Sequence, residues 1–218
     1  MITILQHGEH EPGGTVEDTL HERNEPFSIL RLYEGDPVPA DPPKRLIILG
    51  GQMSVNDERE YPFLVEEKQL VKKAVAHDST VLGICLGAQM IAAACGKVVY
   101  AGEKEIGWRT ITGCNSPGQR FFPGQFPVFH WHKETFDLPE GARLLATGTA
   151  VKNQAFMIRN ALGVQFHPEV TREIIAFWAK DRGAEERDAI LKESEEKLQE
   201  NRVLCDAIIH VFLAGWRW

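Results

Sequence analysis

The sequence predicts an α/β fold: a mainly parallel sheet flanked by helices, with a small antiparallel portion and C-terminal helices. Two continuous apolar runs, at 45–51 and 80–85, have the composition of strands buried on both faces. Residues 63–77 repeat apolar side chains with a helical period, and an alanine-rich apolar segment spans 88–95. Strand, helix, strand and helix in this order indicate parallel strands joined by right-handed crossovers.

The remaining elements extend this pattern on both sides. Near the N-terminus we expect a strand at 2–5, a helix at 15–23, a strand at 27–33 and a proline-rich connection at 34–44. Turn residues, with no helix between them, separate short strand candidates at 97–101, 109–113, 128–132, 143–147, 154–158 and 163–167. We expect these strands to form the antiparallel portion, followed by a helix at 171–180.

The chain changes character after residue 182. Residues 184–202 are dense in Glu, Lys and Arg, and apolar residues then recur at helical spacing up to 212. This pattern is typical of one or two amphipathic helices with a solvated charged face. We therefore expect one domain at 1–182 and a helical extension at 183–218 that packs on the same domain.

Composition and charge exclude several classes of protein. The chain has 218 residues, with 24 basic against 31 acidic side chains and a net charge of −7, which argues against binding to nucleic acid or to an anionic membrane. No apolar run approaches the roughly 18 residues of a membrane span, and the first residues lack the pattern of a signal peptide. Four irregularly spaced cysteines fit reduced thiols, so we expect a cytoplasmic protein.

The first chemical motif surrounds Cys85, between an expected strand and an expected helix. Gly83 and Gly87 flank the cysteine at the spacing of a nucleophile elbow, where larger side chains would clash in a sharp turn. The turn would place the sulfur at a helix N-terminus, where the dipole favours a thiolate, and the amide of Leu86 would face an oxyanion. The alternative is a buried structural cysteine that lies between loop glycines by chance.

A second motif is His167-Pro168-Glu169, at the end of an apolar run. Residues two apart on an extended chain face the same side, and Pro168 favours extended geometry at His167. The carboxylate would then orient the imidazole, which is the base that a nucleophilic cysteine needs. Taken alone, this motif favours the alternative, a surface His–Glu pair at a strand end.

A third motif, Gly50-Gly51, follows a buried strand. Glycines there let backbone N–H groups approach a ligand closely, which suits a second oxyanion donor. A tight turn is the alternative, and the spacing of a phosphate-binding loop is absent from the sequence.

Together these motifs resemble the class I, triad-type glutamine amidotransferases, over residues 45–173 and in the order of that family. The resemblance implies a flavodoxin-like α/β domain. It also implies a nucleophile, Cys85, a base, His167, and its orienting partner, Glu169. The oxyanion N–H groups would come from Gly51 and Leu86.

The resemblance extends to residues that would bind the substrate. Gln89 matches the family's glutamine-binding glutamine, one helical turn after the cysteine. The segment 129–134 resembles the family's substrate loop, which would include Trp131, His132, Lys133 and Glu134. Lys133 stands where the family usually has glycine, which leaves the identity of the substrate open.

His130 and His132 alternate on an expected strand, an arrangement in which two side chains can share a metal ion. No third ligand with suitable spacing lies near them in the sequence. We therefore expect structural histidines, no metal and no cofactor.

More narrowly, the segments at 130–142, 153–156 and 163–171 are similar to stand-alone amidotransferases related to the glutaminase domain of GMP synthase. This likeness implies hydrolysis of the γ-carboxamide of glutamine through a cysteine thioester, with ammonia passed to a separate synthetase. One alternative is a hydrolase of another γ-glutamyl small molecule that has no partner protein. The other is a non-catalytic binding module on the same scaffold.

Overall fold

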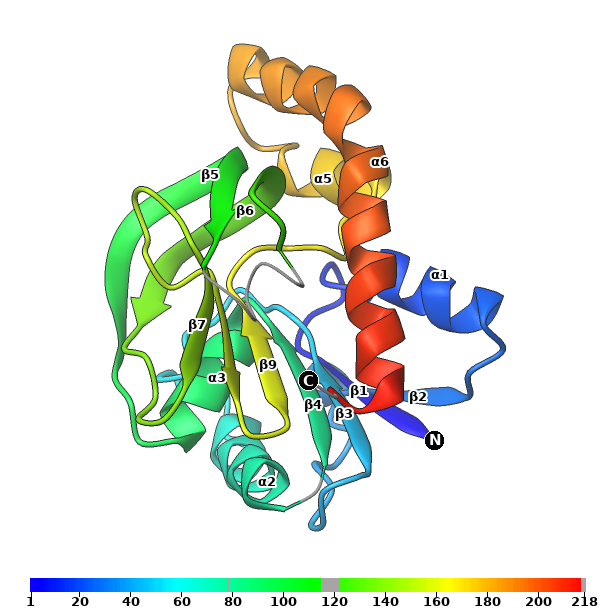
Figure 1. Ribbon diagram of the computed structural model, residues 1–218, viewed down its shortest axis with the longest axis vertical. Helices are drawn as coiled ribbons and strands as arrows, with labels where there is room; N and C mark the ends of the chain where they lie inside the picture. Colours follow the sequence, from blue (N-terminus) through cyan, green and yellow to red (C-terminus); the bar gives the residue numbers. More distant parts are fainter. Residues whose placement is uncertain (78, 115–121, 217–218) are drawn as a thin grey trace.

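The structure is a computed structural model that describes residues 1–77, 79–114 and 122–216. Within these residues, nine strands form one mixed sheet in the order β2-β1-β3-β4-β9-β8-β7-β5-β6, with helices on both faces (Figure 1). The strands are β1 (Ile2–Gln6), β2 (Phe27–Arg31), β3 (Arg45–Ile48), β4 (Thr80–Ile84), β5 (Val99–Gly113), β6 (Gln125–Phe136), β7 (Arg143–Thr147), β8 (Ala155–Ile158) and β9 (Ala161–Val164). The helices are α1 (Thr15–Glu22), α2 (Phe63–Ala76), α3 (Leu86–Ala94), α5 (Arg172–Trp178) and α6 (Ala184–Ala214), with a 3-10 turn, η1 (Leu32–Glu34). The predicted α/β class is confirmed.

Parallel pairing covers one half of the sheet. Strands β2, β1, β3, β4 and β9 run in the same direction, and the pairs β1–β3 and β3–β4 follow the predicted crossovers. Strand β9 pairs antiparallel with β8, as expected, but it also pairs parallel with β4, where Gly83 lies opposite Gly163. A short apolar run carries no signal for which strand it will join. This pairing brings the ends of β4 and β9, and hence Cys85 and His167, to the same edge of the sheet.

The antiparallel half differs from the expected set of short strands. Residues 99–101 of the first predicted segment and all of 109–113 belong to one strand of 15 residues, β5, whose pairing with β6 shifts register between Ala101 and Glu105. That irregularity breaks the alternation of side chains, which is why the sequence pattern divides β5 in two. Strand β6 is likewise longer than 128–132, so β5 and β6 form an extended two-stranded ribbon at the end of the sheet.

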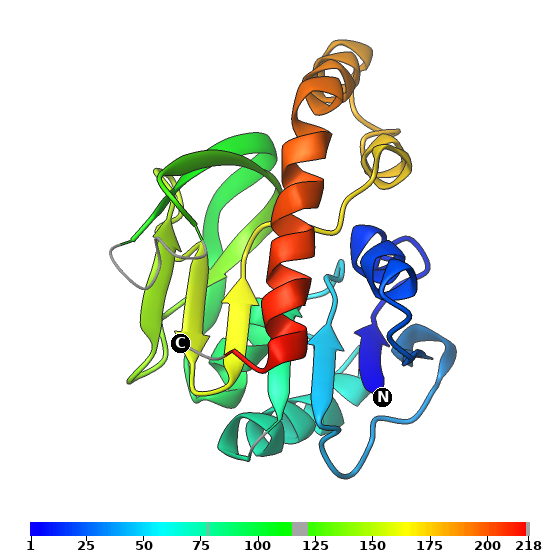
Figure 2. The same cartoon turned by 45° about the vertical axis from the view of Figure 1, so that its right-hand side comes forward.

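Helices cover the two faces of the sheet with separate apolar cores. On one face, α2 and α3 pack through side chains such as Leu70 and Ile91. On the other, α1 and α6 pack through Leu20, Ile208 and Phe212. The charged C-terminal segment forms one continuous helix of 31 residues rather than two, and Figure 2 shows it crossing the front of the sheet. Residues 217 and 218 of the predicted extension lie outside the described residues.

Candidate active site

Cys85 occupies a strained turn between β4 and α3. Its φ is +50°, which is rare for a residue other than glycine, and α3 begins at the next residue. A Cβ atom on Gly83 would lie 2.4 Å from the carbonyl oxygen of Gly87, and one on Gly87 would lie 2.2 Å from that of Ile48. The turn therefore requires both flanking glycines, for the steric reason expected from the sequence.

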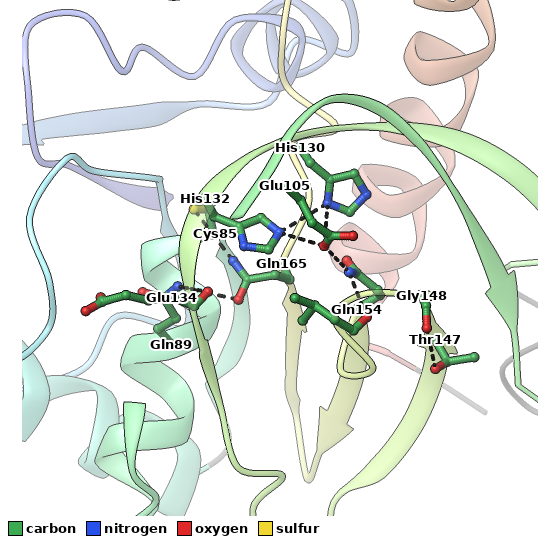
Figure 3. A network of polar contacts seen from close by, with 11 residues as sticks. Cys85, Gln89, Glu105, His130, His132, Glu134, Thr147, Gly148, Gln154 and Gln165 are labelled. Atoms are coloured by element: carbon green, nitrogen blue, oxygen red, sulfur yellow. Dashed lines mark hydrogen bonds and ion pairs between the residues drawn. The ribbon is translucent and has the colours of Figure 1, made fainter. Parts of the chain in front are cut away.

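Cys85 lies at the N-terminus of α3, and the residue is 5% exposed. Its backbone N–H donates to the carbonyl of Val164 on β9 over 2.8 Å, which fixes the turn against the neighbouring strand. The side-chain amide of Gln165 donates to the sulfur over 3.7 Å (Figure 3). Gln165 was missed by the sequence analysis, although it stands two residues before His167 in the same motif.

His167 and Glu169 form a buried ion pair. Nδ1 of the imidazole donates to Oε1 of the carboxylate over 2.7 Å, and both residues are 3% exposed. Burial lowers the pKa of His167, but the Glu169 carboxylate and the Cys85 sulfur raise it more strongly, to about 10. The imidazole is therefore held in its protonated form beside the cysteine. Because both residues are buried and His167 lines the pocket, this is not a surface His–Glu pair.

Three contacts fix His167 from different elements. Its backbone N–H donates to the carbonyl of Phe129 on β6 over 2.8 Å. The ring of Trp178, at the end of α5, packs against the imidazole in a T-shaped arrangement, with 4.8 Å between ring centroids. Asn201 on α6 donates to the carbonyl of Pro168 over 3.0 Å, so the C-terminal helix holds the backbone of the motif.

The Gly50-Gly51 motif follows β3 and lies close to His167 and Cys85. A Cβ atom on Gly50 would lie 3.1 Å from Cε1 of His167, so this glycine allows the backbone to pass close to the imidazole. The carbonyl of Gly50 accepts a 3.2 Å hydrogen bond from Nδ1 of His7, whose Nε2 donates to Glu67 over 3.0 Å. Burial lowers the pKa of His7, but the Glu67 carboxylate outweighs it and raises the pKa above its ordinary value. This buried ion pair joins the residue that follows β1 to α2, and nothing in the sequence pattern indicated it.

Gln89 and the predicted substrate loop lie beside Cys85. The amide of Gln89 donates to the backbone carbonyl of Glu134 over 3.2 Å, so α3 and β6 are joined there (Figure 3). Trp131 stacks on Phe129, with 6.0 Å between ring centroids and 10° between planes. The loop is part of strand β6 rather than a separate segment.

These residues share one pocket of about 460 Å³, within the range of small-molecule sites. Of the residues singled out by sequence, its lining includes Gly51, Cys85, Gln89, Trp131, His132, Lys133, Glu134 and His167. Leu86 begins the helix next to the sulfur, and Glu169 lies behind His167. Lys104 and Lys180 also line the pocket, and sequence reasoning gave no signal for them.

A buried polar cluster joins the substrate loop on β6 to β5. Nε2 of His132 approaches Oε2 of Glu105 within 3.1 Å, and Nδ1 of His130 lies 3.2 Å from Nε2 of His132. Burial lowers the pKa of His130 to about 3, so this imidazole is neutral. Burial raises the pKa of Glu105, but the hydrogen bond from His132, with smaller contributions from other neighbours, lowers it below its usual value. Glu105 was missed because it falls between the two segments into which the sequence pattern divided β5.

Comparison with known proteins identifies the family of this chain. The family model for class I glutamine amidotransferases matches residues 15–174. The glutamine amidotransferase-like protein YfeJ of Salmonella typhimurium is 32% identical over 185 residues, which is 80% of this chain and 77% of YfeJ. A GMP synthase of Bacillus pumilus is 34% identical over 133 residues, 59% of this chain and 25% of that enzyme.

Among solved structures, a glutamine amidotransferase from Thermotoga maritima superposes with a TM-score of 0.87 at 31% identity. That match covers 97% of this chain and 96% of the other. The extent of the family match and the likeness in both sequence and structure confirm the resemblance inferred from the motifs. The chain belongs to the class I glutamine amidotransferase family.

Proposed function

We propose that this protein hydrolyses the γ-carboxamide of glutamine through a thioester on Cys85. The observation that carries the proposal is the meeting of Cys85 and the His167–Glu169 pair in one pocket, at the ends of two adjacent parallel strands. A strained cysteine at a helix N-terminus, next to a buried imidazolium, has the surroundings of a nucleophilic thiolate. Cys85, His167 and Glu169 are the proposed catalytic triad.

In the first half of the reaction, the thiolate attacks the carboxamide carbon. The C–N bond then breaks, His167 gives its proton to the leaving nitrogen, and ammonia departs. In the second half, His167 takes a proton from water, which attacks the thioester and releases glutamate from the sulfur. Glu169 acts by orienting the imidazole and stabilising its positive charge.

The oxyanion that forms in both halves would be held by the backbone N–H groups of Leu86 and Gly51. Leu86 is the first residue of α3, where N–H groups have no partner within the helix. The Gly50–Gly51 peptide is held from the other side, because His7 donates to its carbonyl. In a trans peptide the N–H points away from the carbonyl, so His7 directs the Gly51 N–H away from itself. We therefore assign His7 a positioning role.

The substrate's α-amino and α-carboxylate groups would lie along β6 and α3. Residues proposed to bind them are Gln89, Trp131, His132, Lys133 and Glu134. The released ammonia would pass to a separate synthetase, as the likeness to the amidotransferase portion of GMP synthase suggests. The four unpaired cysteines favour a reducing compartment such as the cytoplasm.

A second candidate function rests on Lys133. This lysine is exposed and lines the pocket together with Lys104 and Lys180. Their ammonium groups would attract a carboxylate on a longer γ-glutamyl substrate, which glutamine lacks. The protein would then hydrolyse γ-glutamyl peptides without a synthetase partner.

Steady-state hydrolysis of glutamine beside a panel of γ-glutamyl peptides separates these functions. Glutamine hydrolysis predicts the highest kcat/KM on glutamine and no selective effect of Lys133→Gly. Recognition of an extended substrate predicts that Lys133→Gly lowers kcat/KM for anionic γ-glutamyl peptides by about tenfold and spares glutamine. If the parent chain hydrolyses neither class while Cys85→Ala leaves ligand binding intact, the protein is a binding module and the proposal is wrong.

A further inference from the structure

The buried polar cluster that joins the substrate loop to β5 contains two imidazoles and one carboxylate whose polar atoms converge. His130, His132 and Glu105 are 0%, 6% and 4% exposed. Nδ1 of His130, Nε2 of His132 and Oε2 of Glu105 form a triangle with sides of 3.1, 3.2 and 3.5 Å. Figure 3 shows the three side chains pointing toward one another from β5 and β6.

Hydrogen bonds alone do not close this triangle. With Glu105 ionised, each of the two nitrogens carries at most one hydrogen, so at least one of the three contacts lacks a proton. A hydrogen aimed along one side also points about 60° away from the next, too far for a shared bond of good geometry. If both nitrogens donate to Glu105, they face each other at 3.2 Å with no attraction between them.

The same triangle matches the face of a tetrahedral metal site. With ligand bonds of about 2.0–2.2 Å, the ligand atoms of such a site lie about 3.3–3.6 Å apart. The observed sides fall within a few tenths of an ångström of this range. Two imidazole nitrogens and one carboxylate oxygen are donors that Zn²⁺ accepts, and neutral imidazoles are the form that binds it.

An outer partner already orients the carboxylate. The side-chain amide of Gln154, which is 0% exposed, donates to Oε2 of Glu105 over 2.8 Å. Hydrogen bonds of this kind hold metal-ligating carboxylates in place. The register of the β5–β6 ribbon brings the ligands together, because Glu105 on β5 lies directly opposite His132 on β6.

We propose that Glu105, His130 and His132 form a binding site for one Zn²⁺ ion. The ion would join β5 to β6 at the point where β6 enters the substrate pocket, since His132 lines the pocket and Lys133 follows it. It would also steady the backbone carbonyl of Phe129, which accepts the N–H of His167. The role is structural, and the proposal does not depend on glutamine hydrolysis.

The test must exclude Cys85, because its sulfur and the neighbouring His167 are also zinc-binding groups. The chain with Cys85→Ala is therefore treated with a chelator, dialysed, and titrated with Zn²⁺ against a chromophoric indicator and with Co²⁺ in the visible range. We expect one equivalent to bind with a Kd below about 1 μM, and the melting temperature to rise with added Zn²⁺. The Co²⁺ complex should have d–d bands without a thiolate charge-transfer band.

Three variants in the same background locate the ion. Glu105→Gln and His132→Gln keep similar shapes but remove a ligand, so we expect each to weaken binding at least 100-fold. His210→Gln replaces an exposed histidine of α6 and should bind like the parent. Binding that survives both ligand variants would overturn the proposal.

If the ligand variants fail to fold, the titration of the Cys85→Ala chain alone tests the zinc site. A folded Cys85→Ala chain that takes up no equivalent of Zn²⁺ at 100 μM would show that the cluster is only a polar network. A Co²⁺ spectrum with a sulfur charge-transfer band would likewise place the ion elsewhere and overturn the assignment.

Discussion

Two substitutions of His7 separate its two buried contacts. Asparagine places an amide near the position of Nδ1 and can still donate to the carbonyl of Gly50, whereas glutamine reaches the position of Nε2 and can still donate to Glu67. If His7 positions the Gly51 N–H through the Gly50 carbonyl, His7→Gln should lower activity more than His7→Asn. The distances of 3.2 Å from Nδ1 to the Gly50 carbonyl and 3.0 Å from Nε2 to Glu67 are those of hydrogen bonds, so each substitution removes one of them.

The magnitudes follow from the role of each contact. Removing an oxyanion donor costs about 2.7–4 kcal/mol of barrier, and His7 acts only by aiming that donor. We expect His7→Gln to lower kcat by about 10–100-fold, or about 1.4–2.7 kcal/mol, and His7→Asn by about threefold or less. Stability should change in the opposite order. His7→Asn leaves Glu67 buried without its partner, at a cost of about 3–5 kcal/mol in the free energy of unfolding.

The assay pairs hydrolysis of a γ-glutamyl anilide with urea denaturation of the same preparations. We expect a crossed pattern, in which the less stable variant, His7→Asn, is the more active one. Activities that fall in the same order as stabilities would refute it, because His7 would then matter only for folding. Full activity in His7→Gln would also remove His7 from the positioning of Gly51.

Other predictions concern the elbow and the triad. Gly87→Ala should lower the free energy of unfolding by more than about 3 kcal/mol, since its Cβ would lie 2.2 Å from the carbonyl oxygen of Ile48. Gly96→Ala, with a positive φ but open space, should cost only about 1 kcal/mol in the same urea titration, and equal costs would contradict the steric argument. The pKa of His167 is raised to about 10 chiefly by the Glu169 carboxylate acting against burial, so the imidazolium is lost only as pH rises through that value. In Glu169→Gln that loss should come at lower pH, and the alkaline limb of the kcat/KM profile should move down by at least one pH unit. An unmoved limb would show that Glu169 does not act on His167.

Sequence reasoning succeeded where one local pattern had one structural outcome. The buried runs before Gly50 and Cys85 are strands, and the glycines around Cys85 lie where a Cβ atom would clash. Pro168 and the spacing of two residues bring His167 and Glu169 into contact as expected. These features depend on a few adjacent residues, so they can be predicted without knowing which distant segments pack against them.

The failures all concern pairing between distant segments. The register shift after Ala101 hid the length of β5, and with it the position of Glu105 opposite His132. The contacts of His7 and Asn201 with the motifs join residues 43 and 33 positions apart or more, and nothing near either residue in the sequence marks them. Such contacts are fixed by strand order and helix packing, which a periodic pattern does not encode.

Peptide mass mapping after treatment with a glutamine-like diazoketone tests the central claim, that Cys85 carries the acyl intermediate. The other three thiols should be far less reactive, because burial raises the pKa of Cys95, Cys114 and Cys205. We expect one adduct per chain, on Cys85, and none in Cys85→Ala. An adduct on another cysteine with Cys85 unmodified, or hydrolysis that continues in Cys85→Ala, would contradict it.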